Sequence, residues 1–500
     1  GLDMTHAASG RKDVVDFVNN IQAKVSAQEG DSLPVSAFTE YVDGSTPSGS
    51  SAYEKRGIAV NIPNWNPDNC IQCNFCAYVC PHAVIRPVAM TAEEAAQAPE
   101  GTKMLDMTGM PGYKFSMTVS ALDCTGCGSC ANVCPGKKGE KALTMVNMEA
   151  NYAESQKVYD FGQTLPIKQE VIDKFKPTTV KGSQFKQPLL EFSGACAGCG
   201  ETPYAKLITQ LFGDRMYIAN ATGCSSIWGN SSPSTPYTVN EKGQGPAWSN
   251  SLFEDNAEFG YGMLLAQNAI RDGLKAKVES VMNSEAASEE VKAACKEYLD
   301  TFTCGATNGA ATDKLVAALE GCDCETCKAI VKDKDFLGKK SQWVFGGDGW
   351  AYDIGFGGVD HVLASGKDIN IMVYDTEVYS NTGGQASKAT KTGAVAQFAA
   401  GGKEVKKKDL ASIAMSYGYV YVAQISMGAD YAQTVKAIAE AEAYPGPSLI
   451  IAYAPCINHG IKKGMSKAQT EEKLAVECGY WNNFRFNPAA EEKFSLDSKA

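Results

Sequence analysis

One cysteine spacing occurs twice in the sequence, and it limits the fold more than any other feature. The two runs are Cys70-x-x-Cys73-x-x-Cys76-x-x-x-Cys80-Pro81 and Cys124-x-x-Cys127-x-x-Cys130-x-x-x-Cys134-Pro135. Three thiolates spaced in this way can bind three corners of a 4Fe-4S cube, and the fourth, before a proline, is directed to a neighbouring cube. We therefore expect one cluster on Cys70, Cys73, Cys76 and Cys134 and a second on Cys124, Cys127, Cys130 and Cys80. Zinc is the weaker alternative, because zinc ribbons use two C-x-x-C pairs and gain nothing from a third evenly spaced cysteine.

The composition indicates a protein of a reducing compartment. The chain has 500 residues and 18 cysteines, and its 57 acidic and 46 basic side chains give a net charge of -11. This balance argues against nucleic acid as the main partner. The cysteines gather in short runs, as is typical of metal ligation rather than of a secreted disulfide scaffold. No segment approaches the ~20 apolar residues of a membrane helix, and the N-terminal segment lacks the apolar run of a signal peptide. We expect a cytoplasmic protein with no membrane partner.

Changes in composition divide the chain into three parts. Residues 1–55 contain a helix-like segment and a Ser/Gly/Pro-rich linker, which we expect to follow a preceding domain. Residues 56–168 hold both cysteine runs and too little apolar material for an ordinary core, so bound clusters are expected to organise a small α+β ferredoxin-like domain. Residues 169–500 form the last domain, with a helical excursion at about 256–340. Because the chain starts at Gly1 and ends without an evident closing element, we expect a piece of a longer protein.

The last domain has the pattern of an α/β fold. Short β-branched runs alternate with helix-period stretches, and strands buried on both faces between helices predict a doubly wound parallel sheet. The predicted strands are Met216–Ala219, Gln342–Phe345, Ile369–Tyr374, Tyr419–Ile425 and Ser448–Tyr453.

A third set of cysteines follows predicted structure in this domain. Cys196 and Cys199 form a C-x-x-C pair, which by itself is ambiguous between a cluster and the alternatives of zinc or a dithiol. Cys224 and Cys456 each follow the end of a predicted strand, and an open α/β sheet places its ligands at that edge. We therefore expect the four thiols to converge.

A glycine-rich segment at the end of another strand predicts a diphosphate site. Phe345-Gly346-Gly347-Asp348-Gly349-Trp350 lets backbone amides approach a phosphate, although the same letters also form common turns. The next strand leads to Thr376 and Val378 at the same edge. A carboxylate, a hydroxyl and a backbone carbonyl make an oxygen-only set that suits Mg²⁺ bridged to a diphosphate.

Taken together, these motifs resemble a known enzyme family. The sequences CAGCGETPY, ATGCSS and YSNTGGQ, the GDG segment and the upstream double cysteine run are similar to those of pyruvate:ferredoxin (flavodoxin) oxidoreductase. The resemblance extends over about residues 56–485. Thr376 stands where most thiamine diphosphate enzymes carry asparagine. This departure matches the variant of the motif in the oxidoreductase family.

The resemblance implies roles for particular residues. Cys196, Cys199, Cys224 and Cys456 are expected to hold a proximal 4Fe-4S cluster, the third in the chain. Mg²⁺ is expected on Asp348, Thr376 and Val378, while Glu201 and Cys224 touch thiamine diphosphate. The cofactor-binding segment includes Gly347, Gly349 and Trp350, and the catalytic residue Asn381 also contacts the cofactor near the substrate.

The resemblance also implies a reaction and its partners. The expected reaction is the oxidative decarboxylation of pyruvate with coenzyme A to acetyl-CoA and CO₂ in anaerobic metabolism. Electrons pass singly through three 4Fe-4S clusters to ferredoxin or flavodoxin. The pyrimidine-binding and coenzyme A-binding parts are expected in N-terminal domains of the same enzyme, which is expected to be a homodimer. The alternatives are the same chemistry on another 2-oxo acid, or an electron-transfer subunit that binds no thiamine.

The remaining polar features are weaker signals. Six cysteines have no assigned role: Cys295, Cys304, Cys322, Cys324, Cys327 and Cys478. Another metal site of Cys322, Cys324 and Cys327 with Cys295 or Cys304 is the alternative, but the three lie in the helical excursion and are interpreted as plain reduced thiols. The basic run Lys403–Asp409 is interpreted as a solvated helix start rather than as a docking patch. His459 is expected to support the structure near Cys456.

Overall fold

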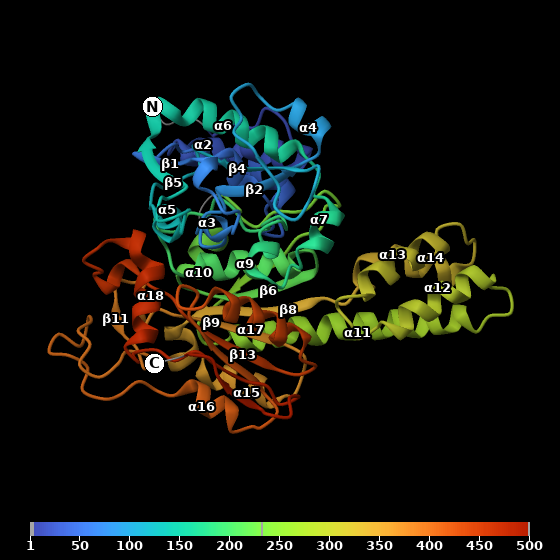
Figure 1. Ribbon diagram of the computed structural model, residues 1–500. Helices are drawn as coiled ribbons and strands as arrows, with labels where there is room; N and C mark the ends of the chain where they lie inside the picture. Colours follow the sequence, from blue (N-terminus) through green and yellow to red (C-terminus); the bar gives the residue numbers. More distant parts are fainter. Residues whose placement is uncertain (1–4, 232–233, 499–500) are drawn as a thin grey trace.

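The computed structural model describes residues 5–231 and 234–498. Its largest sheet has eight strands (Figure 1). Its strands lie in the order β15 (Phe494–Leu496), β14 (Phe484–Phe486), β12 (Tyr421–Ile425), β13 (Ser448–Tyr453), β9 (Asn370–Asp375), β8 (Ser341–Gly347), β6 (Met216–Ala221) and β7 (Ala247–Ser251). The six strands from β12 to β7 are parallel, and β14 and β15 add an antiparallel edge. The predicted α/β class is confirmed, and the five predicted strands correspond to β6, β8, β9, β12 and β13.

Helices cover both faces of this sheet because alternate strand residues point to opposite sides. One face, with Ile218, Phe345 and Ile450, packs against α9 (Thr202–Phe212) and α17 (Tyr431–Ala443). The other face, with Val344 and Leu449, packs against four helices, which are α11 (Asn256–Met282), α15 (Phe356–Ala364), α16 (Leu410–Met415) and α18 (Ala468–Glu477). The sheet is therefore doubly wound.

The cysteine-rich unit forms a separate layer over one side of the sheet (Figure 1). Its strands are β1 (Asn61–Trp65) paired with β5 (Leu143–Asn147), and β4 (Lys114–Val119) between β2 (Ile85–Met90) and β3 (Leu105–Asp106). Its helices are α3 (Phe75–Tyr78), α4 (Ala92–Ala96), α5 (Ser129–Val133), α6 (Met148–Thr164), α7 (Gln169–Lys174) and α8 (Val180–Ser183). The small core of this unit also receives Ile172, Phe185 and Phe192, so residues up to 192 pack with it.

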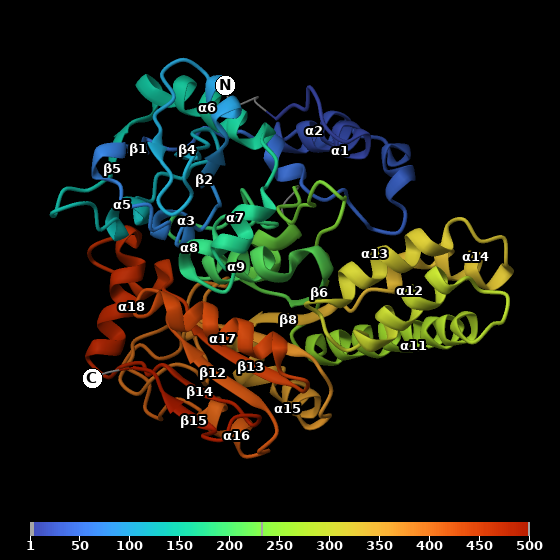
Figure 2. The same cartoon turned by 45° about the vertical axis from the view of Figure 1, so that its right-hand side comes forward.

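The N-terminal segment lies beside this unit (Figure 2). It begins with α1 (Lys12–Phe17), the π-helical turn Val18–Gln22 and α2 (Ala23–Ser26), which together match the expected helix. The stretch predicted as a linker is held in place. Gly49 donates its N–H to the carbonyl of Tyr237 at 2.8 Å, and the Ser50 hydroxyl accepts from Thr235 N–H at 2.8 Å.

The helical excursion projects away from the body of the molecule (Figures 1 and 2). It consists of α11, whose 27 residues span about 40 Å, followed by α12 (Glu289–Asp300), α13 (Asn308–Leu319) and α14 (Glu325–Lys332). These helices share a small apolar core of their own. Arg271 of α11 links separate segments of the excursion, since its guanidinium donates to the carbonyls of Leu337 and Phe302 at 2.8 and 2.7 Å. Among the described helices, none is both long enough and apolar enough for a transmembrane segment.

The cysteine-rich unit is docked on the sheet domain by polar contacts. The buried Lys206 of α9 donates to the backbone carbonyls of Ala77 and Tyr78 at the end of α3. Tyr78 in turn donates its hydroxyl to the carbonyl of Tyr431 at 2.9 Å. Burial lowers the pKa of Lys206 to about 8. A buried cation that satisfies two carbonyls fixes the relative position of the units, because separation would leave those groups without partners.

We predict that Glu472→Gln flattens the pH dependence of stability. Glu472 on α18 is fully buried, and burial raises its pKa to about 8 although Gly428 N–H donates to it at 2.5 Å. A carboxyl with a raised pKa stabilises the fold fully below its unfolded pKa of about 4.5, and this contribution is lost as pH rises toward 8. Wild type should lose up to about 1.4 kcal/mol of unfolding free energy per pH unit relative to the variant across pH 6–8.

The measurement is thermal unfolding of the chain at several pH values. Glu477→Gln on the same helix is the control, because its carboxylate is solvent-exposed and should leave the pH profile unchanged. Parallel pH profiles for wild type and Glu472→Gln would contradict the prediction.

Candidate functional site

The predicted site residues meet at one edge of the sheet. Strands β13, β9, β8 and β6 are consecutive and parallel, so their carboxyl ends lie side by side. The loops that follow them carry, in the same order, Cys456, Thr376, Asp348 and Cys224. The residues therefore converge although they are far apart in the sequence.

Three oxygen groups surround the hydroxyl of Thr376. This hydroxyl lies 2.9 Å from Asp348 Oδ1, 3.0 Å from the carbonyl oxygen of Val378 and 3.4 Å from Ser380 Oγ. Asp348 directly follows β8 and is 1% exposed. The predicted set of carboxylate, hydroxyl and carbonyl is thus brought together, and its donor chemistry fits Mg²⁺.

Buried charge distinguishes this oxygen site. Burial raises the pKa of Asp348 to about 8, and the nearby carboxylate of Asp375 adds to the shift. Hydrogen bonds from Ser387 Oγ (2.5 Å) and Thr376 oppose it. Asp375 is itself paired with Lys407 Nζ at 2.6 Å. A bound divalent cation would compensate the carboxylate of Asp348, which has hydroxyl donors but no ion pair of its own among the described residues.

The sequence analysis did not identify Lys407 as part of this environment. The run Lys403–Asp409 was interpreted as a solvated helix start, and Asp409 does cap α16 through Ser412 N–H at 2.9 Å. That interpretation is wrong for Lys407, which points inward to Asp375 and Glu377. Ser387 was also missed, because a single serine in a loop carries no motif.

The four cysteines of the third set lie together near this oxygen site. Burial raises the pKa of Cys224, and Glu201 and the neighbouring thiols of Cys199 and Cys456 add to the shift. Burial likewise raises the pKa of Cys456 to about 11, with Cys196 contributing. The thiol of Cys199 accepts a backbone N–H at 3.4 Å and that of Cys456 accepts one at 3.5 Å, as is typical of cluster ligands.

Gly200 permits this close approach of distant segments. Its N–H donates to the Pro455 carbonyl at 3.1 Å, and a Cβ at this position would lie 2.5 Å from backbone atoms of Pro455. Only glycine allows the C-x-x-C loop to lie directly against the residue before Cys456.

Cys224 connects the thiols to the oxygen site. Its Sγ lies 3.3 Å from Ser380 Oγ and 3.9 Å from Asn381 Oδ1. Glu201, 4% exposed, accepts the indole N–H of Trp228 at 2.8 Å, and burial raises its pKa to about 7. Cys224 is therefore linked to Thr376 through Ser380, and Asn381 lies beside Cys224.

His459 links two of the loops at this edge of the sheet, those that carry Cys456 and Thr376. Its Nδ1 accepts the N–H of Cys456 at 3.2 Å, so its Nε2 carries the proton that is donated to the Thr376 carbonyl at 2.5 Å. Its ring stacks on the ring of Tyr453, with the two ring centroids 6.3 Å apart. The supporting role expected for His459 agrees with this arrangement.

The glycine-rich segment has a packing role in addition to its expected binding role. Trp350, fully buried, fills the space beside Gly346, where a Cβ would lie 2.3 Å from its ring. A Cβ at Gly349 would lie equally close to the ring of Tyr379, while one at Gly347 would make only an ordinary contact, 3.9 Å from the Tyr374 carbonyl oxygen. Trp350 thus belongs to the core on one face of the sheet.

The eight cysteines of the double run form two crossed groups. Burial raises the pKa of Cys76, and the thiols of Cys73, Cys70 and Cys134 add to the shift. Burial raises the pKa of Cys130 in the same way, chiefly with Cys127, Cys80 and Cys124. Each group therefore takes three thiols from one run and the fourth from the other, as the spacing predicts. Backbone N–H groups of Gln72 and Gly126 donate to Cys70 and Cys124 at 3.3 Å.

One contact joins the double run to the third set. Burial raises the pKa of Cys127, and backbone N–H groups, including that of Gly198, oppose this shift by donating to the thiol. Gly198 lies between Cys196 and Cys199 in the sequence. The second crossed group is thus separated from the third set by a single backbone segment.

Comparisons with known families bear out both predicted cofactor classes. Residues 69–138 match the 4Fe-4S dicluster domain, and residues 330–452 match the C-terminal TPP-binding domain of thiamine pyrophosphate enzymes. Residues 5–59 match a domain of unknown function.

Whole-chain relatives agree with these matches. The chain is 57% identical over 498 residues to pyruvate:ferredoxin oxidoreductase of Moorella thermoacetica, covering 97% of this chain and 42% of the relative. It is 55% identical to pyruvate-flavodoxin oxidoreductase of Enterobacter agglomerans, covering 97% and 41%. The chain thus spans about two fifths of the relatives it matches. A solved 2-oxoglutarate:ferredoxin oxidoreductase of Magnetococcus marinus aligns with a TM-score of 0.31 and 15% identity over 53% of this chain and 65% of that chain, too weak a likeness for argument.

We predict that Cys456→Ser removes one cluster and leaves two. Three sets of four thiols should hold about twelve irons per chain, and loss of one ligand of the third set should lower the count to about eight. Iron analysis and electron paramagnetic resonance of anaerobically purified protein measure this change. Cys478→Ser, an exposed cysteine outside the three sets, is the control. A wild-type value near eight would contradict the third cluster.

Proposed function

We propose that this chain, which is similar over nearly its whole length to part of the pyruvate:ferredoxin and pyruvate-flavodoxin oxidoreductases, is the C-terminal portion of such an enzyme. The intact enzyme oxidatively decarboxylates pyruvate with coenzyme A, giving acetyl-CoA and CO₂. Electrons leave singly through three 4Fe-4S clusters to ferredoxin or flavodoxin. The enzyme acts in the cytoplasm in anaerobic metabolism.

The observation that carries this proposal is the oxygen site beside the third cysteine set. The Thr376 hydroxyl contacts both the buried carboxylate of Asp348 and the carbonyl of half-buried Val378, and Cys224 is linked to this hydroxyl through Ser380. A thiamine diphosphate site alone needs no cysteine beside it, and an electron carrier alone needs no buried oxygen set. Their adjacency supports a site where substrate electrons are released directly to a cluster.

The chain's residues hold and orient the cofactor in this proposal. Asp348, Thr376 and Val378 would hold Mg²⁺, and the backbone amides of Gly347 and Gly349 would approach the diphosphate. Bound thiamine diphosphate supplies the electron sink for decarboxylation. Glu201 and Cys224 contact the cofactor, and Asn381, on the exposed side of Cys224, positions the substrate.

The outward electron path follows from the contact between cysteine sets. The set formed by Cys196, Cys199, Cys224 and Cys456 would hold the proximal cluster, a group that accepts one electron at a time. The backbone of Gly198 joins this set to Cys127 of the neighbouring set. The remaining crossed set would hold the cluster that faces the external acceptor.

The missing parts of the active site belong to the rest of the enzyme. We assign the pyrimidine-binding and coenzyme A-binding functions to N-terminal domains of the same enzyme, which is a homodimer. Another 2-oxo acid remains the nearest alternative substrate, because the acyl pocket is formed largely by those domains. An electron-transfer subunit that binds no thiamine is the alternative from another class.

We predict that Asp348→Ala in the intact enzyme abolishes magnesium-dependent binding of thiamine diphosphate and leaves the ferredoxin-type clusters intact. The variant loses the only carboxylate of the proposed Mg²⁺ set, so affinity should fall at least 100-fold. Calorimetric titration with thiamine diphosphate and Mg²⁺ measures binding, and iron content verifies the clusters. Asp313→Ala, on the exposed surface of the excursion, is the matched control. Unchanged binding in Asp348→Ala would favour the electron-transfer subunit.

Substrate choice is tested separately on the intact enzyme. We expect kcat/KM for pyruvate to exceed that for 2-oxoglutarate by at least 100-fold. Reduction of ferredoxin under anaerobic conditions in the presence of coenzyme A gives both values. A preference for 2-oxoglutarate would retain the chemistry but replace the substrate.

A further inference from the structure

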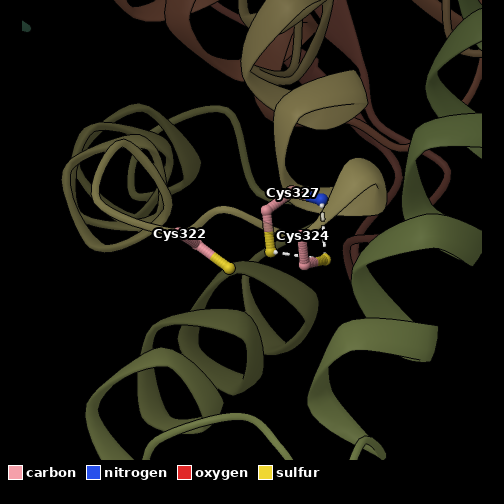
Figure 3. A group of neighbouring side chains, drawn as sticks. All are labelled: Cys322, Cys324 and Cys327. Carbon is pink, nitrogen blue, oxygen red and sulfur yellow. Dashed lines mark hydrogen bonds between the residues drawn. The ribbon is translucent and has the colours of Figure 1, made fainter.

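Three cysteines with no assigned role meet at the far end of the helical excursion. The Sγ atoms of Cys322, Cys324 and Cys327 all lie within 4.8 Å of one another (Figure 3). The sequence analysis interpreted them as plain reduced cysteines, and considered Cys295 or Cys304 as additional partners. Within the described residues the structure groups the three without Cys295 or Cys304.

The local fold holds the three thiols in one place. Cys322 and Cys324 lie in the short loop between α13 and α14, and Cys327 lies in the first turn of α14. Cys324 is the N-cap of α14, and its sulfur accepts the N–H of Cys327 at 3.3 Å. Cys327 is 1% exposed and packs in the excursion core, so the helix fixes one thiol rigidly while the loop places the other two around it.

Cys324 also receives a backbone hydrogen bond. The N–H of Cys327, at the start of the helix, is donated to the Cys324 sulfur at 3.3 Å. An N–H donor to that sulfur also stabilises the bound state, because outer contacts of this kind orient metal ligands.

We propose that Cys322, Cys324 and Cys327 form a binding site for a single zinc ion. A Zn–S length of about 2.3 Å places the sulfurs of a tetrahedral site roughly 3.8 Å apart, within the spacing found here. Three thiolates select a thiophilic cation over Mg²⁺ or Ca²⁺. The exposure of Cys324 leaves the fourth position open to water.

The grouping of three thiols fits a metal ion better than a redox disulfide. The sulfurs of Cys324 and Cys327 are 3.3 Å apart, and joining them would require an oxidant to remove two electrons. A disulfide would also leave the third thiol, Cys322, without a function in the group. A single ion uses all three, and it would fasten the α13–α14 loop to the first turn of α14.

This site is independent of the proposed oxidoreductase function. The excursion projects from the sheet domain, and α14 lies in it far from the loops that follow β6, β8 and β9 (Figures 1 and 2). Zinc binding can therefore succeed or fail as a prediction without reference to thiamine or to the iron clusters.

The test is zinc content and coordination in the anaerobically purified chain, with Cys324→Ser as the main variant. Serine remains a good helix N-cap, so this change removes the thiolate while keeping α14. We expect one zinc per wild-type chain. Cys324→Ser removes a direct ligand, so its zinc affinity should fall by more than the 10–100-fold lost when a group that only hydrogen-bonds to a ligand is removed. Competition with a chromophoric chelator gives the affinity. Zinc K-edge X-ray absorption should show three sulfur ligands at about 2.3 Å.

Cys322→Ser is the second variant, and Cys304→Ser in the same excursion is the matched control, which should retain zinc. Iron content is measured in every sample so that zinc placed in the cluster sites is recognised. Equal zinc affinity in wild type and Cys324→Ser would overturn the proposal. A Cys324–Cys327 disulfide in the reduced, anaerobic wild-type chain, detected by mass after alkylation, would overturn it as well.

Discussion

The parallel pairing of four central strands is the constraint on which the rest of the structure depends. Because β13, β9, β8 and β6 end at one edge, the loops after them place Cys456, Thr376, Asp348 and Cys224 together. A shift of one residue in any strand would turn its side chains to the opposite face. Both faces of these strands are covered by apolar helix contacts, so the register is fixed by burial on two sides. The relative positions of the site residues are therefore fixed by the packing of the sheet core rather than by contacts among the site residues.

Buried charge is the second organising element. Two neighbouring carboxylates cannot both remain ionised inside a protein without cations nearby. Lys407 is turned inward to Asp375, and Lys206 is turned inward to the end of the helix that carries Cys76. Each lysine serves a group on another segment of the chain. Asp348 has no lysine paired with it among the described residues: the hydroxyls of Ser387 and Thr376 and the N–H of Thr376 donate to its carboxylate, whose charge an added cation would compensate.

The sequence predicted the features that depend on local pattern. The crossed grouping of the eight cysteines and the central strands follow from spacing or periodicity that a few residues contain. The edge strands β14 and β15 were not predicted, because they have three residues each and carry no periodic signal. The inward direction of Lys407 and the hydrogen bond from Ser387 were not predictable either, since both depend on partners that only the folded sheet brings near.

The two kinds of cysteine set differ in how much of the chain must exist before they can form. All ligands of the crossed groups lie between Cys70 and Cys134, and the core around them is complete at Phe192. The third set joins Cys196 to Cys456 across the whole sheet. Domains generally fold as units from the N-terminus during synthesis. The ferredoxin-type unit can thus fold while the ribosome is still translating the sheet domain, so the proposed outlet for electrons is assembled before the proposed thiamine diphosphate site.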